Sequence, residues 1–449
     1  MMKLGKRETF SSIMALALPI VAEEILSTLL QYVDTAMVGR LGAEATASVN
    51  LTSTVNWLLG SLMSSFGIAI VAMISSSYGR KDREGIKRQS ATGFILSLAL
   101  GLTLFAICLS ISPFLPTWMN ADPAIRKRAG EYFFIISLAL PFRSLSVMAA
   151  SSMRAIKDSK TPMVVNLSQN LVNIILNYIL IYPMEMGVRG AAAATFVSYT
   201  LGSVVMAQAA YKKKELSFSR NELKNQKPLI KEALSIALPA SATNTTSCLG
   251  HITFASLVSS MGTITFAAHS IALSAETLFY VPGYGLRGAT STLIGISVGE
   301  GDRKKFKEIE HLSIAITVVM MTFTGLLLHI FAYPIMKIFT PDQRVVEMGA
   351  EVLKMIALSE PIFGLMIVSE GICYGLGDTK FPFAVETFGA WGIRILLSVL
   401  GLKYLGISLF GVWICMLLDN MFRALALFIP LISGRDRKLY EKRRKGLER

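Results

Sequence analysis

MALALPIVAEEILSTLLQYVDTAMVG, residues 14–39, is the stretch that decides the fold, because the second half of the chain repeats part of it. Its Ala17-Leu18-Pro19 returns as Ala237-Leu238-Pro239, 220 residues later and again inside a long apolar segment. The same spacing relates further identical pairs, namely Gly79 and Gly299, Asp82 and Asp302, Arg83 and Arg303, Pro141 and Pro361, Asp158 and Asp378, Lys160 and Lys380, and Pro162 and Pro382. One register kept through so many apolar segments indicates the duplication of a membrane unit.

The composition places both copies in a lipid bilayer. Of the 449 residues 53% are hydrophobic and 16% are charged, against about 25% charged in soluble domains. The mean hydropathy is +0.53. Apolar stretches of about 20 residues, long enough to cross the hydrocarbon core, lie near residues 13–38, 50–77, 91–112, 132–153, 162–182, 190–210, 234–258, 267–298, 312–332, 351–374, 381–402 and 406–432. Since open sheet edges cannot face lipid, we predict an all-α integral membrane protein with about 12 transmembrane helices, six in each half.

The distribution of basic residues orients the spans. With the N-terminus in the cytoplasm, 31 Lys and Arg residues fall in cytoplasmic segments, 8 in external loops and 5 within spans. Because each half has six spans, the chain returns to the cytoplasmic side after each half, and both halves enter the membrane from that side. We therefore expect parallel repeats and two cytoplasmic termini. The formal charge of +14 then reflects loops beside anionic lipid, not a nucleic-acid surface. We expect a multi-pass protein of the plasma (inner) membrane.

This layout divides the chain into five segments. They are a cytoplasmic N-terminus (1–12), an N-lobe with spans 1–6 (13–210), a basic cytoplasmic linker (211–233), a C-lobe with spans 7–12 (234–432) and a basic cytoplasmic tail (433–449). The first apolar stretch is too long for a removable signal peptide, so we expect it to remain as span 1.

The sequence carries no signature of an enzyme or of a transition-metal site. Its four cysteines and four histidines are scattered through the chain without metal-ligand or redox spacing. No phosphate-binding glycine loop precedes a Lys-Ser or Lys-Thr pair, so any pumping must be driven by an ion gradient. A membrane enzyme acting on polyprenyl lipids would need clustered Asp-rich motifs for Mg²⁺, which the sequence also lacks. We expect that the protein is not an enzyme and that it uses no cofactor other than a coupling ion, Na⁺ or H⁺.

Span 1 contains acidic groups, which are costly in a bilayer. A charged side chain at mid-membrane costs about 2.5–3.5 kcal/mol even on mild insertion scales, so Glu23, Glu24 and Asp34 are functional candidates. Eleven residues separate Glu23 from Asp34, which places them within about 20° of each other around a helix. The two carboxylates are expected to share a face.

Span 5 carries a stripe of four amides. Asn166, Asn170, Asn173 and Asn177 fall within an arc of about 60° on a helix. The stripe could hold helices together by hydrogen bonds worth about 0.6 kcal/mol each. Alternatively, it could form a cation site once Asp34 supplies a negative charge.

The second half does not copy this chemistry. The positions 220 residues beyond Asp34, Asn170, Asn173 and Asn177 are Phe254, Ala390, Ile393 and Leu397. We therefore expect ion coupling in the N-terminal half.

Other polar and helix-breaking residues in the spans allow two readings each. Pro19 and Pro239 interrupt matched helices and could be hinges or tolerated packing kinks. His251 could carry a proton or be a hydrogen-bonded core histidine. Asp419 and Arg423, four residues apart, are expected to pair with each other.

Several motifs resemble those of one transporter family. The Val-Asp-Thr-Ala-Met-Val-Gly-Arg-Leu-Gly run at 33–42, the Gly-x-x-Asp-Arg loops at 79 and 299, and the Asp-Thr-Lys-Phe-Pro run at 378 resemble the multidrug and toxic compound extrusion (MATE) family. The resemblance covers about residues 10–432. It implies two six-helix lobes around a V-shaped cavity, and export of organic, often cationic, compounds in exchange for Na⁺ or H⁺.

The resemblance also assigns site residues. It puts the N-lobe carboxylate on Asp34 and the kinking proline on Pro19. In the branch that resembles the DNA-damage-inducible transporters, the cation site further uses positions occupied here by Asn173, Asn177 and Thr195, and an aromatic residue at Tyr132. That branch has an acid where this chain has Asn177. Another branch relies on C-lobe acids whose positions fall here on Ser247 and Phe363, so that mechanism is not expected.

We therefore predict a secondary active multidrug antiporter, with a flippase of lipid-linked oligosaccharides as the alternative. Asp34, Asn173, Asn177 and Thr195 could give Na⁺ hard oxygen ligands, or Asp34 could carry a proton. Candidate substrate-cavity residues are Glu23, Gln31, Tyr132, Asn166, Asn170, His251 and Glu276. The expected partners are small organic molecules and the bilayer, not nucleic acid, and we expect a monomer.

Overall fold

The computed structural model describes residues 2–447, with side chains from residue 6 onward. The described residues form helices and short connections, without a β-strand. Two compact units emerge, and we describe each by itself. The N-unit comprises residues 22–237, and the C-unit comprises the chain up to residue 21 together with the chain from residue 238 onward.

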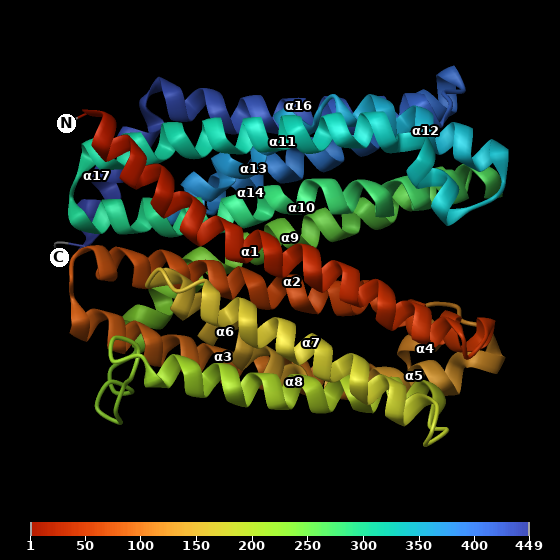
Figure 1. Ribbon diagram of the computed structural model, residues 1–449, viewed down its shortest axis with the longest axis horizontal. Coiled ribbons are helices and arrows are strands. Elements are labelled where there is room, and N and C mark those ends of the chain that lie inside the picture. The colour runs from red at the N-terminus through yellow and green to blue at the C-terminus, as the bar shows by residue number, and fades with distance from the viewer. Residues whose placement is uncertain (1, 448–449) are drawn as a thin grey trace. The chain divides into compact units, whose positions relative to one another are not determined.

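The N-unit is built from long helices that pack side by side (Figure 1). Beginning with the part of α1 (Met2–Gly39) after residue 21, it contains α2 (Ala43–Gly79), α3 (Arg83–Ile111), α4 (Leu115–Trp118), α5 (Pro123–Ser137), α6 (Leu140–Ala155), α7 (Lys160–Ile181) and α8 (Gly187–Lys212). Helix α6 packs against α2, α3 and α8, and α7 packs against α8. Apolar clusters around Ile70 and Phe133 form its core.

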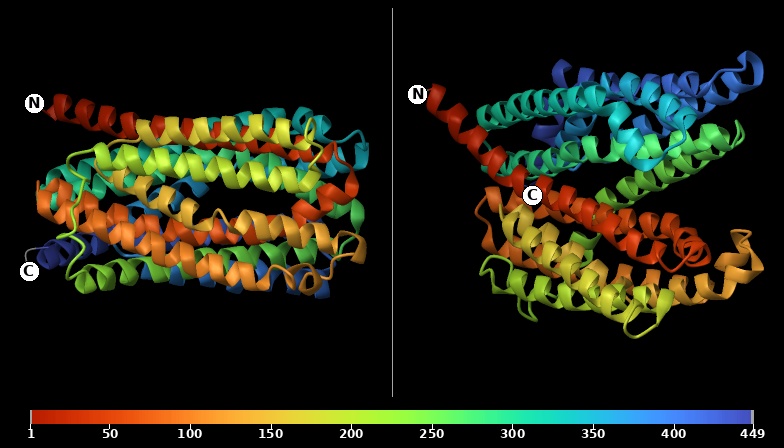
Figure 2. Two further views of the ribbon diagram at one scale, coloured as in Figure 1. Left: turned by 90° about the horizontal axis from the view of Figure 1, so that it is seen from below. Right: turned by 45° about the vertical axis from the view of Figure 1, so that its right-hand side comes forward.

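The C-unit repeats this plan with more interrupted helices (Figure 2). After the first part of α1 it contains α9 (Lys227–Ser259) from residue 238, α10 (Thr263–Glu300), α11 (Arg303–Phe339), α12 (Gln343–Ala357), α13 (Glu360–Gly375), α14 (Lys380–Thr387), η1 (Phe388–Ile395), α15 (Leu396–Leu400), η2 (Gly401–Leu405), α16 (Leu409–Pro430), η3 (Leu431–Arg435) and α17 (Asp436–Leu447). The three η segments are π-helical turns. Helix α10 packs against α11, α12 and α13, and α13 packs against α16.

The helices are long and apolar enough for a multi-span membrane protein. Within the described residues nine helices qualify as membrane spans, and eleven do if each of two bent pairs counts as one span. The pairs are α5 with α6, bent by 45°, and α12 with α13, bent by 55°. Helix α9 occupies the place of the expected span 7 but is not among these nine. Its most apolar stretch is less hydrophobic than theirs because the helix carries a polar run over residues 241–247. The expected layout of about twelve helices in two halves is consistent with these elements.

The duplicated loop motif is a helix start in both halves. Asp82 accepts a hydrogen bond from the backbone N–H of Gly85 at 2.8 Å, and Asp302 accepts one from Lys305 at 2.9 Å. Each aspartate therefore caps the N-terminus of the next helix, α3 or α11. The residue before each cap, Lys81 or Gly301, has a positive φ, of 58° and 72° respectively. The repeat thus conserves a turn geometry as well as residue types.

Close helix contacts are repeated as well. A Cβ added to Gly101 on α3 would lie 3.1 Å from the Cβ of Ser144 on α6. At the matched positions, a Cβ added to Gly364 on α13 would lie 3.0 Å from the Cβ of Met321 on α11. Helices α3 and α6 in the first half, and the matched helices α11 and α13 in the second, therefore approach each other closely. The glycine that permits the approach lies on α3 in the first half and on α13 in the second. The internal repeat is therefore structural.

The compact units differ from the expected lobes at two helices. Residues 13–21 were expected in the N-lobe, but Ile13, Leu16 and Ala17 are buried with Leu286 and Leu293 of α10, which places this part of α1 in the C-unit. The physical reason is that these apolar side chains have their packing partners on α10.

The start of α9 belongs to the N-unit, although most of that helix was expected in the C-lobe. Ala233, Ile236 and Ala237 are buried with Ile70 and Met73 of α2, in the N-unit. The chain therefore changes unit inside α1 and inside α9, within two residues of Pro19 and Pro239.

Candidate functional site

Helices α1 and α7 are joined by a ladder of side-chain hydrogen bonds. The Nδ2 of Asn166 donates to the Oε1 of Glu23 at 2.6 Å, and the Nδ2 of Asn170 donates to the Oγ of Ser27 at 3.1 Å. Further along, the Nδ2 of Asn177 donates to the Oδ1 of Asp34. Each pair is separated by 143 positions in the sequence, so the two helices run in parallel and in register. The predicted acidic face of α1 thus meets the predicted amide stripe of α7.

The far end of this ladder gathers the four predicted cation ligands. Besides Asp34, the Nδ2 of Asn177 donates to the Oδ1 of Asn173 at 3.2 Å. The Nδ2 of Asn173 in turn lies 3.4 Å from the Oγ1 of Thr195 and 3.3 Å from the Oγ of Ser198, both on α8. Ser198 was missed by the sequence reasoning, although its position one helical turn after Thr195 could have indicated it.

Burial leaves one oxygen of this cluster available. Asn177 is fully buried, and Asp34 is partly buried. Among the described residues, the Oδ1 of Asn177 has no hydrogen-bond partner although it is buried. Such an acceptor is costly unless it binds something. A carboxylate, amide oxygens and a hydroxyl are donors that suit a hard cation, and the single carboxylate matches a single positive charge.

The near end of the ladder is an ion pair. The Nη2 of Arg154 lies 2.8 Å and 2.9 Å from the two carboxylate oxygens of Glu23, which also accepts the bond from Asn166. Glu23 is 6% exposed, so the pair compensates a buried charge. The charge of Glu23 is neutralised inside the N-unit.

The remaining predicted cavity residues are distributed over both units. Gln31 lies exposed on α1, and Tyr132 is buried on α5, close enough to Asp34 to interact electrostatically. His251 on α9 and Glu276 on α10 belong to the C-unit. His251 lies within electrostatic range of Arg394.

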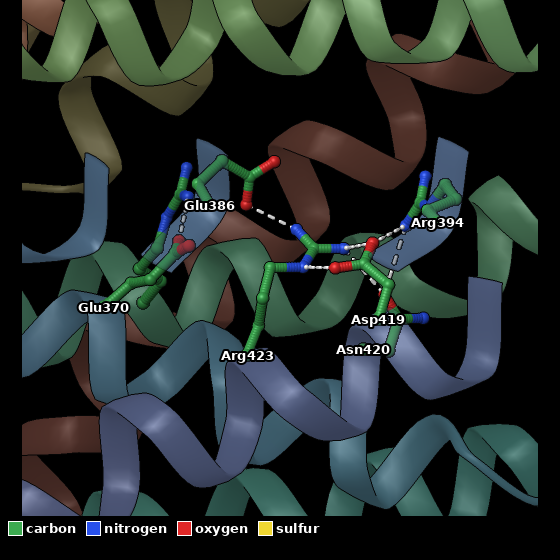
Figure 3. Close-up of polar contacts among 7 residues, drawn as sticks. Glu370, Glu386, Arg394, Asp419, Asn420 and Arg423 are labelled. Carbon is green, nitrogen blue, oxygen red and sulfur yellow. Dashed lines mark hydrogen bonds and ion pairs between the residues drawn. The ribbon is translucent and has the colours of Figure 1, made fainter. Parts of the chain in front are cut away.

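The C-unit holds a buried network of charges, shown in Figure 3. Arg423 on α16 pairs with Glu386 on α14 and with Asp419, whose Oδ1 lies 2.8 Å from the Nε of Arg423. Arg394 on η1 lies 2.8 Å from the Oδ2 of Asp419, and Asn420 accepts a bond from Arg423 at 2.7 Å. The predicted pairing of Asp419 with Arg423 is confirmed. Sequence spacing did not indicate Glu386 or Arg394, because they come from another helix.

This network lies beside the position that the repeat matches to Asp34. Phe254, at the position matched to Asp34, has the guanidinium of Arg394 5.7 Å from its ring centroid. The network contains two arginines and two carboxylates, so its charges balance without an added ion. That ion coupling lies in the first half stays a prediction.

Solved structures share this fold. The chain matches an outward-facing multidrug resistance MATE family transporter of the MOP superfamily with a TM-score of 0.91, 22% identity and 96% coverage of both chains. A MOP superfamily transporter from Pyrococcus furiosus, whose binding pocket is described as having reverse polarity, matches with a TM-score of 0.91, 21% identity and 96% coverage of both chains.

Two curated relatives are similar in sequence to nearly the whole chain. The probable multidrug resistance protein NorM of Thermotoga maritima is 26% identical over 436 residues, which is 96% of this chain and 94% of the relative. The probable multidrug resistance protein YoeA of Bacillus subtilis is 24% identical over 422 residues, covering 92% and 91%. A family model described as MatE matches residues 19–179 and 239–400, one block in each half. With the duplicated helices and the membrane spans, these matches show that the chain belongs to the MATE family of multidrug transporters.

Proposed function

We propose that the protein is a secondary active antiporter that exports organic, lipophilic cations in exchange for Na⁺ or H⁺. Membership of a multidrug transporter family supports efflux. The observation that carries the coupling is the pair formed by the Asp34 carboxylate and the unpartnered Oδ1 of Asn177. This arrangement resembles the site of the DNA-damage-inducible branch, with one acid replaced by an amide.

The hydrogen bonds suggest how an ion would enter. Asn177 turns its N–H toward Asp34, and its oxygen has no hydrogen-bond partner among the residues that the structure describes. A Na⁺ ion beside Asp34 would repel that N–H and attract the oxygen, so half a turn of the Asn177 amide would accompany Na⁺ binding. A proton on the Oδ2 of Asp34 would leave the bond from Asn177 in place. A Na⁺ ion would in addition recruit the oxygens of Asn173 and Thr195, whereas a proton needs only one acceptor.

Transport requires that the ion bind two states of the protein with different affinity. Asp34 and Pro19 lie on the same helix, α1, and the change of compact unit falls two residues beyond that proline. We propose that ion binding at Asp34 changes the bend of α1 at Pro19 and thereby favours the state that releases substrate outward. Pro239 in α9 would serve as the matching hinge.

The substrate class follows from the side chains available. The first half offers acids in α1, and the chain's 22 methionines and many aromatic side chains adapt to varied apolar shapes. A lipophilic cation would be attracted by the acids and would pack against the methionine and aromatic side chains. The excess of basic residues in the loops expected to be cytoplasmic supports a plasma-membrane protein with both termini in the cytoplasm. We propose that it works as a monomer.

Dye efflux from proteoliposomes tests this function. A fluorescent cationic dye is loaded, and its release is followed under an imposed Na⁺ gradient and then under a pH gradient. We expect one gradient to drive efflux in the wild type and Asp34→Asn to abolish the gradient dependence. Glu44→Gln is the control, because Glu44 lies in an ion pair with Arg128 in which both side chains are more than half exposed.

Each outcome decides between functions. Gradient-dependent efflux in Asp34→Asn would refute the assigned coupling site. Absence of dye movement under either gradient, with active flipping of a fluorescent lipid-linked oligosaccharide, would replace the antiporter by the flippase.

A further inference from the structure

Helices α10 and α13 of the C-unit pack in parallel with a fixed register. A Cβ on Gly375 would lie 2.5 Å from the carbonyl oxygen of Ser291, one on Gly371 would lie 2.8 Å from that of Arg287, and one on Gly283 would lie 3.4 Å from Ile367, while the rings of Tyr280 and Phe363 are 5.4 Å apart. Partners on successive levels differ by 84, 84, 84 and 83 positions. One helical turn further, this register sets Glu276 opposite Glu360.

Both carboxyl groups are buried, and neither is paired with a cation in the part of the chain that the structure describes. Glu276 is 7% exposed and Glu360 is 2% exposed. None of the ion pairs in the described part of the chain includes either of them, and the Oε2 of Glu360 is buried without a hydrogen-bond partner there. Glu360 experiences the charge of Glu276. The register and the electrostatic interaction agree that the two acids face each other.

The charged and titratable groups on neighbouring elements have other partners. Arg394 of η1 acts electrostatically on Glu276, but it is paired with Asp419 of α16 at 2.8 Å. The hydroxyl of Tyr280 lies 3.3 Å from the Oγ1 of Thr277.

The remaining groups lie in separate contacts. They are Arg287 paired with Glu370 on α13, His329 of α11 bonded to the carbonyl of Lys354 on α12, Arg423 of α16 paired with Glu386 of α14, His269 of α10 bonded to Trp413, Tyr284 beneath Arg287, and His251 of α9. None of these contacts within the described residues pairs a cation with either of the two acids.

Elementary electrostatics fixes the charge of such a pair. Two facing carboxylates in a low-dielectric site cannot both be ionised, so one of them retains a proton. Glu360 is the first residue of α13, where the positive end of the helix dipole favours the charged form. Glu276 lies in the middle of α10, away from a helix end, but within range of the positive charge of Arg394. We propose that Glu276 and Glu360 form a proton-binding site that holds one proton shared between the two carboxyl groups.

The site belongs to the second half alone. The corresponding helices α2 and α6 have the same register, since a Cβ on Gly67 would lie 2.5 Å from the Oγ of Ser151, 84 positions later. The level matched to the two acids contains Asn56 and Leu140. The N-unit therefore has a carboxylate with amides on α1 and α7, and the C-unit has a carboxyl pair on α10 and α13.

The position of the pair gives the proton a mechanical consequence. Glu360 directly follows the break at which α12 and α13 bend by 55°. Loss of the shared proton would place two like charges across the α10–α13 contact and push the helices apart beside this bend. As far as this change contributes to transport, the inference rests on the proposed function. The existence of the shared proton does not.

Infrared spectroscopy of the purified full-length protein at pH 7 tests the site without a transport assay. A buried protonated carboxyl group gives a C=O band that shifts in D₂O. We expect the wild type to show this band and Glu276→Gln to lose the intensity of one carboxyl group. The control Glu44→Gln should leave the band unchanged, since that acid is exposed and paired with Arg128. Retention of the full band in both Glu276→Gln and the Glu276→Gln/Glu360→Gln variant would overturn the proposal.

A second variant keeps the test decisive if Glu276→Gln does not fold. Glu360→Gln removes the like charge that keeps the shared proton bound, so the band should disappear at a pH about one unit lower than in the wild type. An unchanged midpoint would refute the pairing. Failure of dye efflux with the expected infrared result would reject the proposed antiport and leave the proton site standing.

Discussion

Lys213, just beyond the last helix of the first repeat, lies with its Nζ 2.7 Å from the Oδ2 of Asp158, in the loop between α6 and α7. The second repeat has the same relationship, since Arg435 lies 2.9 Å from Asp378, the aspartate matched to Asp158. In both repeats a basic residue that follows the last span, α8 or α16, thus pairs with an aspartate in the loop between two earlier spans.

The pair of Lys213 and Asp158 in the N-unit should depend on pH. Burial by itself would raise the pKa of Asp158, but hydrogen bonds from Lys213 and Thr161 outweigh it and hold that pKa below its usual value. The contribution to stability is then fully present above the unfolded pKa of about 3.9 and is lost as the pH falls through the lower folded pKa. We expect Asp158→Asn to cost about 1 kcal/mol at pH 7. Thermal unfolding in detergent should show this difference at pH 7 and lose it below about pH 3.

The exposed pair between Glu44 and Arg128 provides the comparison, and Glu44→Gln should change the unfolding temperature little at either pH. A destabilisation by Asp158→Asn that persists unchanged at the lowest pH would contradict the ionic origin of the effect.

Thr195 distinguishes the two possible coupling ions. Its Oγ1 lies 3.4 Å from Asn173 and would be a ligand of Na⁺ but not of a proton on Asp34. In a Na⁺-coupled protein, Thr195→Val should raise the Na⁺ concentration for half-maximal efflux by about tenfold, equivalent to about 1.4 kcal/mol. In a proton-coupled protein the same variant should keep its pH dependence. Efflux measured against Na⁺ concentration and against pH separates the cases.

Thr200→Val is a suitable control, because Thr200 on the same helix bonds only to the carbonyl oxygen of Phe196 in the contacts described. If Thr200→Val changed the Na⁺ dependence as much as Thr195→Val did, a specific ligand role for Thr195 would be excluded.

Gly389 should tolerate no side chain. A Cβ there would lie 2.3 Å from the Oδ1 of Asp419 and 2.7 Å from the Cγ of Arg423, both within the buried network. We expect Gly389→Ala to destabilise the protein by about 1–3 kcal/mol, because the network must shift to admit the methyl group. Gly392→Ala is the matched control one turn away, where a Cβ meets the Phe388 ring at an ordinary 3.4 Å. Thermal unfolding of the two variants measures the difference, and equal stability would contradict the tight packing of the network.

Local periodicity predicted the part of the site that lies on two helices. The arc of Asn166, Asn170 and Asn177 on α7 and the shared face of Glu23 and Asp34 on α1 follow from 3.6 residues per turn. The contact between the two faces is expected as well, because a polar helix face in a membrane is more stable against another polar face than against lipid. The structure adds the register of 143 positions that pairs each amide with its partner.

Contacts between distant helices could not be predicted in the same way. Arg154 is 131 positions from Glu23, and Glu386 is 37 positions from Arg423, so no helical period relates the partners. Among the repeat positions, Arg394 replaces an apolar residue of the first half, Ile174, and gives no warning of its role. The place where α1 changes compact unit was also missed, because the apolar residues 13–21 look like any other part of span 1.

That change of unit affects how the chain can be made. Leu16 completes its core only beside Leu286 on α10, about 270 residues later, which at ribosomal speeds is a delay of roughly 10 to 50 s. During that time the first part of α1 must remain in lipid as a helix with satisfied backbone bonds but without its final neighbours. Residues 233–237 likewise lie beside helices made long before them. Each half of the sequence therefore supplies a short helical segment to the core of the other unit, and neither half contains all the residues of one unit's core.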